Sequence, residues 1–339
     1  MTTPPPPQPQ YQQAPPQQPQ PPYQPPQAPP QAPQAPQAPQ QQAYGPPQPV
    51  PQPGQQAGYP AASAVGRSHL GHALLSEWTK IRTVRSTVWT LALLFVLTVG
   101  IGALFALALS GEEYVGLPLL AGTFFGLMFG QICVITLGVL VISSEYGTGM
   151  MRTTLTASPQ RGRILLAKVL VFFGVSFVMT LLATTLSGLV QSSLLSGQSA
   201  TDRYIDSYME SSIENGEVIA TGTHWIDATF GVSLYVSLLG VLGLAVGALL
   251  RHSAGAITTM LALVLLPLLA AMFMFGESME SLRDFLIEYA PLNGLATLFG
   301  LPMGSGDDPI SGWGLLAILA AATTAALIGA YAKLVTTDA

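Results

Sequence analysis

Six long apolar runs constrain this sequence more than any other feature. They lie at about residues 88–109, 117–142, 164–190, 230–250, 254–275 and 313–331. A helix needs about 20 apolar residues to cross a hydrocarbon core of ~30 Å. Charged residues make up 9% of the chain, far below the share in a soluble domain of about 25%. We therefore predict an all-α polytopic membrane protein with six transmembrane helices.

The distribution of lysine and arginine predicts how these spans are oriented. If both termini are cytoplasmic, the cytoplasmic segments hold ten basic and three acidic residues, a net charge of +7. The other side then holds two basic and fourteen acidic residues, which is −12 and accounts for the overall −5. The N-terminus lacks the basic and apolar segments of a cleaved signal peptide. We expect a multi-pass plasma membrane protein with both termini in the cytoplasm.

Residues 1–62 have a different composition from the rest of the chain. They hold 23 of the 29 prolines, many glutamines and no charged residue. Such a segment cannot bury enough apolar surface to offset the entropy lost on folding. We predict a disordered Pro/Gln-rich cytoplasmic tail, separate from a membrane domain at 68–339. The tail is interpreted either as a ligand for proline-recognising modules or as a spacer.

An amphipathic helix is expected at 68–87, before the first span. Ser68 can cap it, and apolar residues recur at intervals of three, four and seven from Leu70. A helix with one apolar and one basic face suits the headgroup region of an anionic leaflet. It could also be a simple extension of the first span. Its charged and aromatic candidates are Glu77, Trp78, Lys80, Arg82 and Arg85.

The loop at 143–163, between the second and third spans, is too long and too patterned for a simple turn. Two methionines and Leu155 give it an apolar stripe, which suggests a short helix that another protein could bind. Its basic residues, together with Lys168, are also explained as positive-inside anchors. The informative residues are Glu145, Gly147, Met150, Met151, Arg152, Thr154 and Leu155.

Small and polar residues inside the spans predict close helix packing. Glycines at intervals of four allow two helices to approach closely, either within one chain or at a dimer seam. Buried threonines and glutamines could line a substrate path, although such groups more often join helices, at roughly 0.6 kcal/mol each. The glycines are Gly122, Gly126, Gly130, Gly243 and Gly247; the polar residues are Gln131, Thr136, Thr180, Thr184 and Thr185.

Several missing patterns narrow the function classes. No carboxylate, lysine or histidine lies at the centre of a span, which argues against an ion-coupled transporter. No Gly-Lys pair occurs, so the chain lacks the phosphate loop of a Walker A ATPase. The one cysteine, Cys133, falls inside a span and cannot form a disulfide framework. We expect no catalytic residues, cofactor, metal or nucleic-acid partner, and any ATPase activity would belong to another subunit.

Two segments resemble those of bacterial ABC transporter permeases of the type-2 exporter class. One is Leu75-Ser-Glu-Trp-Thr-Lys-Ile-Arg-Thr-Val-Arg-Ser-Thr. The other is Ser144-Glu-Tyr-Gly-Thr-Gly, followed by Arg152-Thr-Thr-Leu and Pro159-Gln-Arg-Gly-Arg. Together with the six spans, the resemblance extends from residue 68 to the C-terminus and excludes the tail.

The resemblance implies a dimer of membrane subunits, homomeric or heteromeric, bound to two ATP-binding cassette subunits. A coupling helix at about 147–156 would dock on each ATPase, with Met150, Met151 and Leu155 as its apolar contact. Glu145 and Arg152 would be polar clamps at the edges, and residues 77–85 would border the same surface. The resemblance does not indicate a substrate; the apolar spans with scattered threonines and glutamines suit an amphipathic or hydrophobic one. Ser158 and Pro159 would start the third span.

Two other functions remain open at this point. The first is a non-transporting membrane scaffold or sensor that recruits partners through its tail, which deletion of the tail would disable. The second is a secondary transporter or channel, which would show flux independent of ATP.

Overall fold

The computed structural model describes residues 69–112, 116–150, 161–199, 213–304 and 309–337. All of them belong to one of the two units of the chain, Ala62–Ala339. The predicted tail lies outside the described residues. So do Ser68, Ser158 and Pro159, the residues expected to start two of the helices.

Within the described residues, six helices are long and apolar enough to cross a membrane, which confirms the predicted all-α, six-span fold. In α3 and α5 the helix continues past the predicted ends of the spans. The fourth span opens with the short α6 (Gly222–Trp225) and a six-residue π-helix, η3 (Ile226–Gly231). The main helices are α2 (Arg85–Leu109), α3 (Gly122–Gly147), α5 (Arg161–Leu195), α7 (Val232–Leu250), α8 (Ser253–Ala271) and α11 (Gly312–Thr337).

The helix predicted at 68–87 is divided into two. Helix α1 covers Leu70–Thr83, and the single extended residue Val84 (φ −77°, ψ 111°) separates it from α2. The N-cap of α1 is His69, which makes no capping hydrogen bond through its side chain. Because the backbone is not helical at Val84, α1 is a separate element and not a straight extension of the first span.

Helix α3 begins at Gly122, five residues later than predicted. The carbonyl of Pro118 accepts a hydrogen bond from the Ala121 N–H (2.9 Å), which forms a turn before the helix. Proline has no N–H to donate, so it suits this turn better than the interior of a helix.

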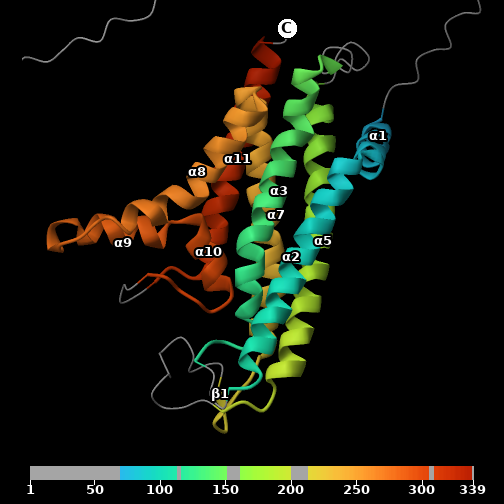
Figure 1. Ribbon diagram of the computed structural model, residues 1–339. Coiled ribbons are helices and arrows are strands. Elements are labelled where there is room, and N and C mark those ends of the chain that lie inside the picture. The colour runs from blue at the N-terminus through green and yellow to red at the C-terminus, as the bar shows by residue number, and fades with distance from the viewer. Residues whose placement is uncertain (1–68, 113–115, 151–160, 200–212, 305–308, 338–339) are drawn as a thin grey trace, which may run out of the picture. The chain divides into compact units, whose positions relative to one another are not determined.

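Helices α3 and α7 form the centre of the helical bundle (Figure 1). Helix α3 packs against α2 and α7, α5 packs against the same two helices, and α11 packs against α7. Most of the α7 span is buried, whereas α2, α8 and α11 expose most of their apolar surface. Surface of that kind is suited to lipid or to other membrane proteins.

The connections between the spans contain the short elements. Strands β1 (Ile213–Glu214) and β2 (Glu217–Val218) form a hairpin, and Asn215 and Gly216 form its turn with positive φ values of 54° and 83°. The spacing of Tyr204, Tyr208 and Ile213 favours a short helix before this turn, whereas the structure places Ile213 in a strand.

Residues 276–312 are too apolar for a solvated loop and predict short helices. These helices are present as η4 (Glu277–Met279), α9 (Glu280–Glu288) and α10 (Pro291–Leu298). We call the end of the bundle that carries the β1–β2 hairpin the hairpin end and the opposite one the 143–163 end.

Candidate functional site

Four oppositely charged side chains meet where α1, α3 and α5 come together at the 143–163 end. Lys168 Nζ lies 2.8 Å from Glu77 Oε2 and 2.6 Å from Glu145 Oε1. Lys80 Nζ lies 2.8 Å from Glu77 Oε1 and 2.9 Å from the same Glu145 oxygen. Two positive and two negative groups balance, so this charge cluster of Glu77, Lys80, Glu145 and Lys168 is neutral overall.

The cluster attaches α1 to the bundle through charged side chains, beside Leu74 and Ile81, which are half-buried on the same face of the helix. Glu77 is the one residue of α1 that is buried, whereas Leu75 and Trp78 are 64% and 49% exposed. Glu77 and Lys80 are three positions apart, so both face the same side of the helix. Helix α1 therefore presents its charges to α5 and leaves much of its apolar surface outside.

Lys168 is the most enclosed member of the cluster, with 1% of its surface exposed. An ammonium group taken out of water is stable only when it is paired and hydrogen-bonded. Both carboxylates supply that pairing, from partners 91 and 23 positions away in the sequence. The positive-inside interpretation accounts for the presence of Lys168 but not for its burial.

The cluster reaches the surface at Lys80, whose side chain is 35% exposed. Burial alone lowers the pKa of Lys80, but hydrogen bonds to Glu77 and Glu145 and their negative charges outweigh that effect. The pKa of Lys80 is therefore raised above its usual value. Glu145 Oε2 is buried and has no hydrogen-bond partner among the described residues.

A second contact holds the end of α3 from the other side. The Arg251 guanidinium carbon lies 5.1 Å from the centre of the Tyr146 ring, which is cation–π geometry. Arg251 ends α7 in the left-handed conformation (φ 54°), and the next residue, His252, caps α8 by accepting the Gly255 N–H through Nδ1 (3.0 Å). The last turn of α3 is thus linked to α1, α5 and the α7–α8 connection.

Two more cations at this end bind the carboxyl ends of helices. Lys333 Nζ donates to the Leu249 carbonyl of α7 (2.6 Å), and Arg161 donates to the Leu334 and Val335 carbonyls of α11 (3.2 and 3.0 Å). The last carbonyls of a helix lack partners within the helix and carry partial negative charge, so cations stabilise them. Residues that sequence reasoning explained by topology alone therefore also join α7 to α11 and α5 to α11.

The described part of the 143–163 loop differs from the expected docking element in one respect. Gly147 ends α3, and Met150 is 51% exposed. Glu145, expected as an edge contact for a partner, is instead 7% exposed and held by two lysines. The other candidates lie outside the described residues: Met151, Arg152, Thr154 and Leu155.

The candidates on the interfacial helix also separate into two groups. Glu77, expected to border a partner surface, is buried in the charge cluster. Trp78, Arg82 and Arg85 are exposed on or next to α1. The i, i+3 spacing of Glu77 and Lys80 was a signal for one charged face, but it did not reveal that this face is directed inward.

The five glycines lie at helix contacts inside the chain. A Cβ on Gly126 would come within 2.7 Å of the Leu97 and Thr98 carbonyl oxygens of α2. Cβ atoms on Gly243 and Gly247 would lie 3.0 Å from carbonyl oxygens of α3. Gly122 and Gly130 likewise face side chains of α2, so the described conformation uses these glycines within one chain and not at a dimer seam.

Sequence reasoning missed the closest approach of α3 and α7. A Cβ on Gly138 would overlap the Gly240 carbonyl oxygen, and one on Gly240 would lie 2.7 Å from a Val134 methyl carbon. Gly240 and Gly243 are three positions apart, so no four-residue spacing marked this contact.

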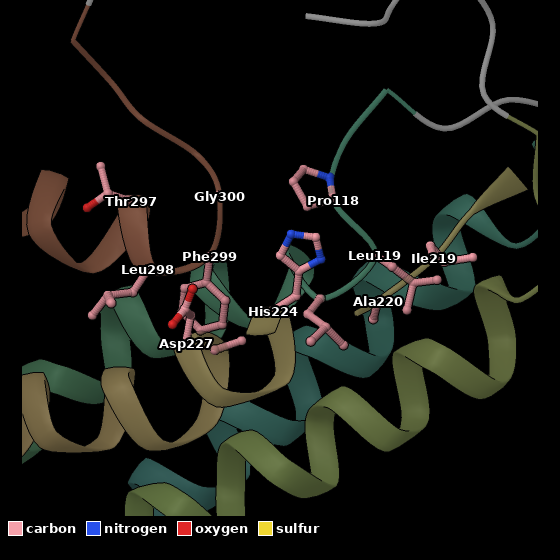
Figure 2. A pocket seen from close by; sticks show the side chains of 12 residues that line it. Pro118, Leu119, Ile219, Ala220, His224, Asp227, Thr297, Leu298, Phe299 and Gly300 are labelled. Carbon is pink, nitrogen blue, oxygen red and sulfur yellow. The ribbon is translucent and has the colours of Figure 1, made fainter. Parts of the chain in front are cut away.

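A hollow of about 180 Å³ lies at the hairpin end (Figure 2). The segment before α3, the segment after β2, the start of the fourth span and the end of α10 all contribute to its wall. Most of the lining is apolar, including Leu119, Leu120 and Phe299. His224 and Asp227 add polar groups, and Asp227 is oriented by a hydrogen bond from Trp313 Nε1 (2.7 Å).

No protein-family model matches this chain, and no curated protein matches it either. A functional assignment therefore depends on the residues and on their geometry.

Proposed function

We propose that this chain is the permease subunit of an ATP-binding cassette exporter. It moves an amphipathic or hydrophobic substrate across the plasma membrane, using ATP hydrolysed by a separate subunit. The observation that carries the proposal is the attachment of the last turn of α3, from which the 143–163 loop leaves the bundle. This turn contains Glu145 and Tyr146, which contact three other parts of the bundle.

Such an attachment suits a segment that transmits force. A partner that moved the loop would pull Glu145 against Lys168 and Lys80, and thereby α5 and α1. Separating a buried ion pair is costly, so these helices would move together and not one by one. An equilibrium between two arrangements of the helices could then follow the state of the ATPase.

The other features support the same function. Sequence motifs in 75–87 and 144–163 resemble those of type-2 exporter permeases. The basic residues concentrate on the side of the loop, which favours a cytoplasmic loop and cytoplasmic termini. The apolar surfaces left exposed on α2, α8 and α11 suit the lipid bilayer and a second permease copy.

The test uses Met151→Asp combined with Leu155→Asp in the full-length protein. Purification from the native membrane should recover an ATP-binding cassette subunit with the unaltered chain and much less of it with the double variant. Thr336→Asp is the matched control, because it adds a carboxylate at an exposed site near the same end. Consistent absence of an ATPase partner from the unaltered protein, together with unchanged transport by the double variant, would exclude this function.

The tail gives a specific reason to test a scaffold or sensor as the alternative. Its 23 prolines suit recognition by proline-binding modules. Deletion of residues 2–62 should leave most transport intact if the chain is a permease. Loss of the cellular role with unchanged ATP-driven transport would favour the scaffold. Flux in reconstituted vesicles without ATP would instead favour a channel or secondary transporter.

A further inference from the structure

Helix α5 is polar on its buried face and apolar on its exposed face. Six hydrogen-bonding side chains on the buried face are each at most 1% exposed. On the opposite face, leucines and a valine between residues 166 and 189 are 41–55% exposed. We call the buried set the α5 stripe: Lys168, Ser176, Thr180, Thr184, Ser187 and Gln191.

The α5 stripe is long enough to cross the membrane. Lys168 and Gln191 lie in one continuous helix of 35 residues. At about 1.5 Å per residue, the distance between them is roughly 34 Å, compared with a hydrocarbon core of about 30 Å. Between Lys168 and Gln191 the stripe contains hydroxyl groups and no charge. Phe172 is an apolar member of the same buried face.

Interhelical hydrogen bonding explains both ends of the stripe but not its middle, since Lys168 bonds to Glu77 of α1 and Glu145 of α3. Near the hairpin end, Ser187 and Gln191 bond to Thr123 of α3 and to each other. Further along, Ser176 and Thr184 donate to carbonyls four positions earlier in α5 itself (2.9 and 3.0 Å). The hydroxyl of Thr180 has no hydrogen-bond partner among the described residues. The middle of the stripe, which is three of its six members, therefore does not join α5 to its neighbours.

Buried oxygens without partners also occur on α2 and α3 and at the end of the stripe. They are Thr98 Oγ1, Gln131 Oε1 and Gln191 Oε1, none of which has a hydrogen-bond partner among the described residues. A buried polar atom without a partner carries a desolvation cost, and it calls for an explanation such as bound water or another conformation.

The described conformation leaves little room for an occupant at these oxygens. A Cβ on Gly122 would lie 2.8 Å from Gln191 Oε1, and one on Gly130 would lie 3.0 Å from Thr98 Oγ1. Helices α2, α3 and α5 are therefore closely packed around polar groups that lack hydrogen bonds. A second arrangement, in which these helices separate, would allow the groups to bind water or a ligand.

Each end of the stripe meets a distinct feature. At the 143–163 end, Lys168 belongs to the charge cluster. At the hairpin end, Gly188 lies between Ser187 and Gln191. A Cβ on it would be 2.9 Å from the Trp225 ring and 3.5 Å from a Leu120 methyl carbon. Leu120 also lines the hollow, so its side chain adjoins both that hollow and α5.

We propose that the α5 stripe, with Thr98 and Gln131, is the wall of a translocation path that is closed in this structure. The open path binds uncharged hydrogen-bonding groups, such as hydroxyls and amides, of an amphipathic molecule. A charged group would find no counter-ion between Lys168 and Gln191. The path runs from the charge cluster to the hollow, and Leu120 and Trp225 close it at the hairpin end. The inference rests on the proposed function in treating the bound molecule as a transported substrate.

Thiol labelling in membranes tests the path without knowledge of the substrate. In a Cys133→Ala background, single cysteines are placed at Thr180, in the stripe, and at Val236, a fully buried apolar site on α7. Leu182→Cys, on the exposed face of α5, reports reaction from the lipid side. The probe is 2-hydroxyethyl methanethiosulfonate, which is polar and neutral. It reacts with the thiolate, which apolar burial suppresses, so Thr180→Cys should react ~10-fold faster than either control.

Ser176→Cys provides a second stripe position with almost unchanged side-chain volume, in case Thr180→Cys fails to fold. If both stripe cysteines react as slowly as Val236→Cys, with and without ATP and the ATPase partner, the path is excluded. ATP-driven export with unreactive stripe cysteines would exclude the path but leave the exporter function intact. Fast labelling in a protein that has no ATPase partner would support the path and contradict the exporter function.

Discussion

The charge cluster and the α5 stripe are both polar, both buried and both on α5, yet they differ in how their groups are paired. In the cluster, four charged groups make four ion pairs of 2.6–2.9 Å. In the middle of the stripe, Ser176 and Thr184 bond to carbonyls of their own helix, and Thr180 bonds to nothing among the described residues. Pairing, and not polarity, decides whether a buried group holds the bundle together. We interpret the cluster as the contact that holds α1, α3 and α5 together, and the middle of the stripe as a surface that can bind another molecule.

The largest loss of folding stability should come from removing the cation at the centre of the charge cluster. Lys168→Met leaves the Glu77 and Glu145 carboxylates buried with only Lys80 between them. Loss of one partner from a buried ion pair costs about 3–5 kcal/mol. Unfolding of the purified protein in detergent by a denaturing surfactant measures this change.

Lys333→Met is the matched control, because Lys333 lies at the same end and binds one carbonyl oxygen and, among the described residues, no carboxylate. The free energy of unfolding should fall less for Lys333→Met, by about 1.5–3 kcal/mol, the contribution of one hydrogen bond to a charged group. Replacing Glu77 and Glu145 by Gln in the Lys168→Met protein should restore part of the stability, since no unpaired charge then remains. Equal losses of unfolding free energy for Lys168→Met and Lys333→Met would mean that the charge cluster stabilises the fold no more than the single hydrogen bond of Lys333 to a helix end.

A smaller loss should follow Thr123→Val, which breaks the interhelical part of the stripe. Thr123 bonds to Ser187 (2.9 Å) and to Gln191 across the α3–α5 contact. Such bonds contribute about 0.6 kcal/mol on average and at most about 1.7 kcal/mol in membrane proteins. The same unfolding measurement applies, and Thr258→Val is the control, because Thr258 is exposed and bonds within its own helix. If Thr123→Val lowered the free energy of unfolding as much as Lys168→Met does, the charge cluster would not hold the bundle together more strongly than the stripe does.

The smallest change in the free energy of unfolding is expected for Thr180→Val. The side chains have nearly the same shape, and the lost hydroxyl has no partner among the described residues. Its removal should change the free energy of unfolding by between zero and a gain of about 1 kcal/mol. Unfolding of Thr180→Val and Thr123→Val in parallel gives the comparison. A clear loss for Thr180→Val would show that the hydroxyl is hydrogen-bonded in the folded protein.

The sequence predicted the features that depend on neighbouring residues along the chain. Apolar runs of about 20 residues located the spans, because each segment must satisfy membrane thickness by itself. The Asn215-Gly216 turn and the short helices of 276–312 were also predictable from local composition. The break at Val84 and the start of α3 at Gly122 were not, because the ends of helices depend on turns and packing that hydropathy does not describe.

The α5 stripe and the charge cluster could be predicted only in part from local sequence patterns. The spacing of Ser176, Thr180 and Thr184 is visible in the sequence, since they repeat every four residues in an apolar run. The sequence does not say whether that face meets lipid or protein. Likewise, Lys168 looks like a topological anchor until Glu77 and Glu145 are brought to it from 91 and 23 positions away.

By itself, then, the sequence determined that the chain is a six-span helical membrane protein and where its spans lie. The tertiary structure decided which polar groups meet, and so turned Glu145 from an expected surface contact into a buried partner of two lysines. The physical reason is the range of the interactions. Hydrophobic length and charge bias act on each segment alone, whereas the energy of a buried charge depends on partners that only the folded chain brings within 3 Å.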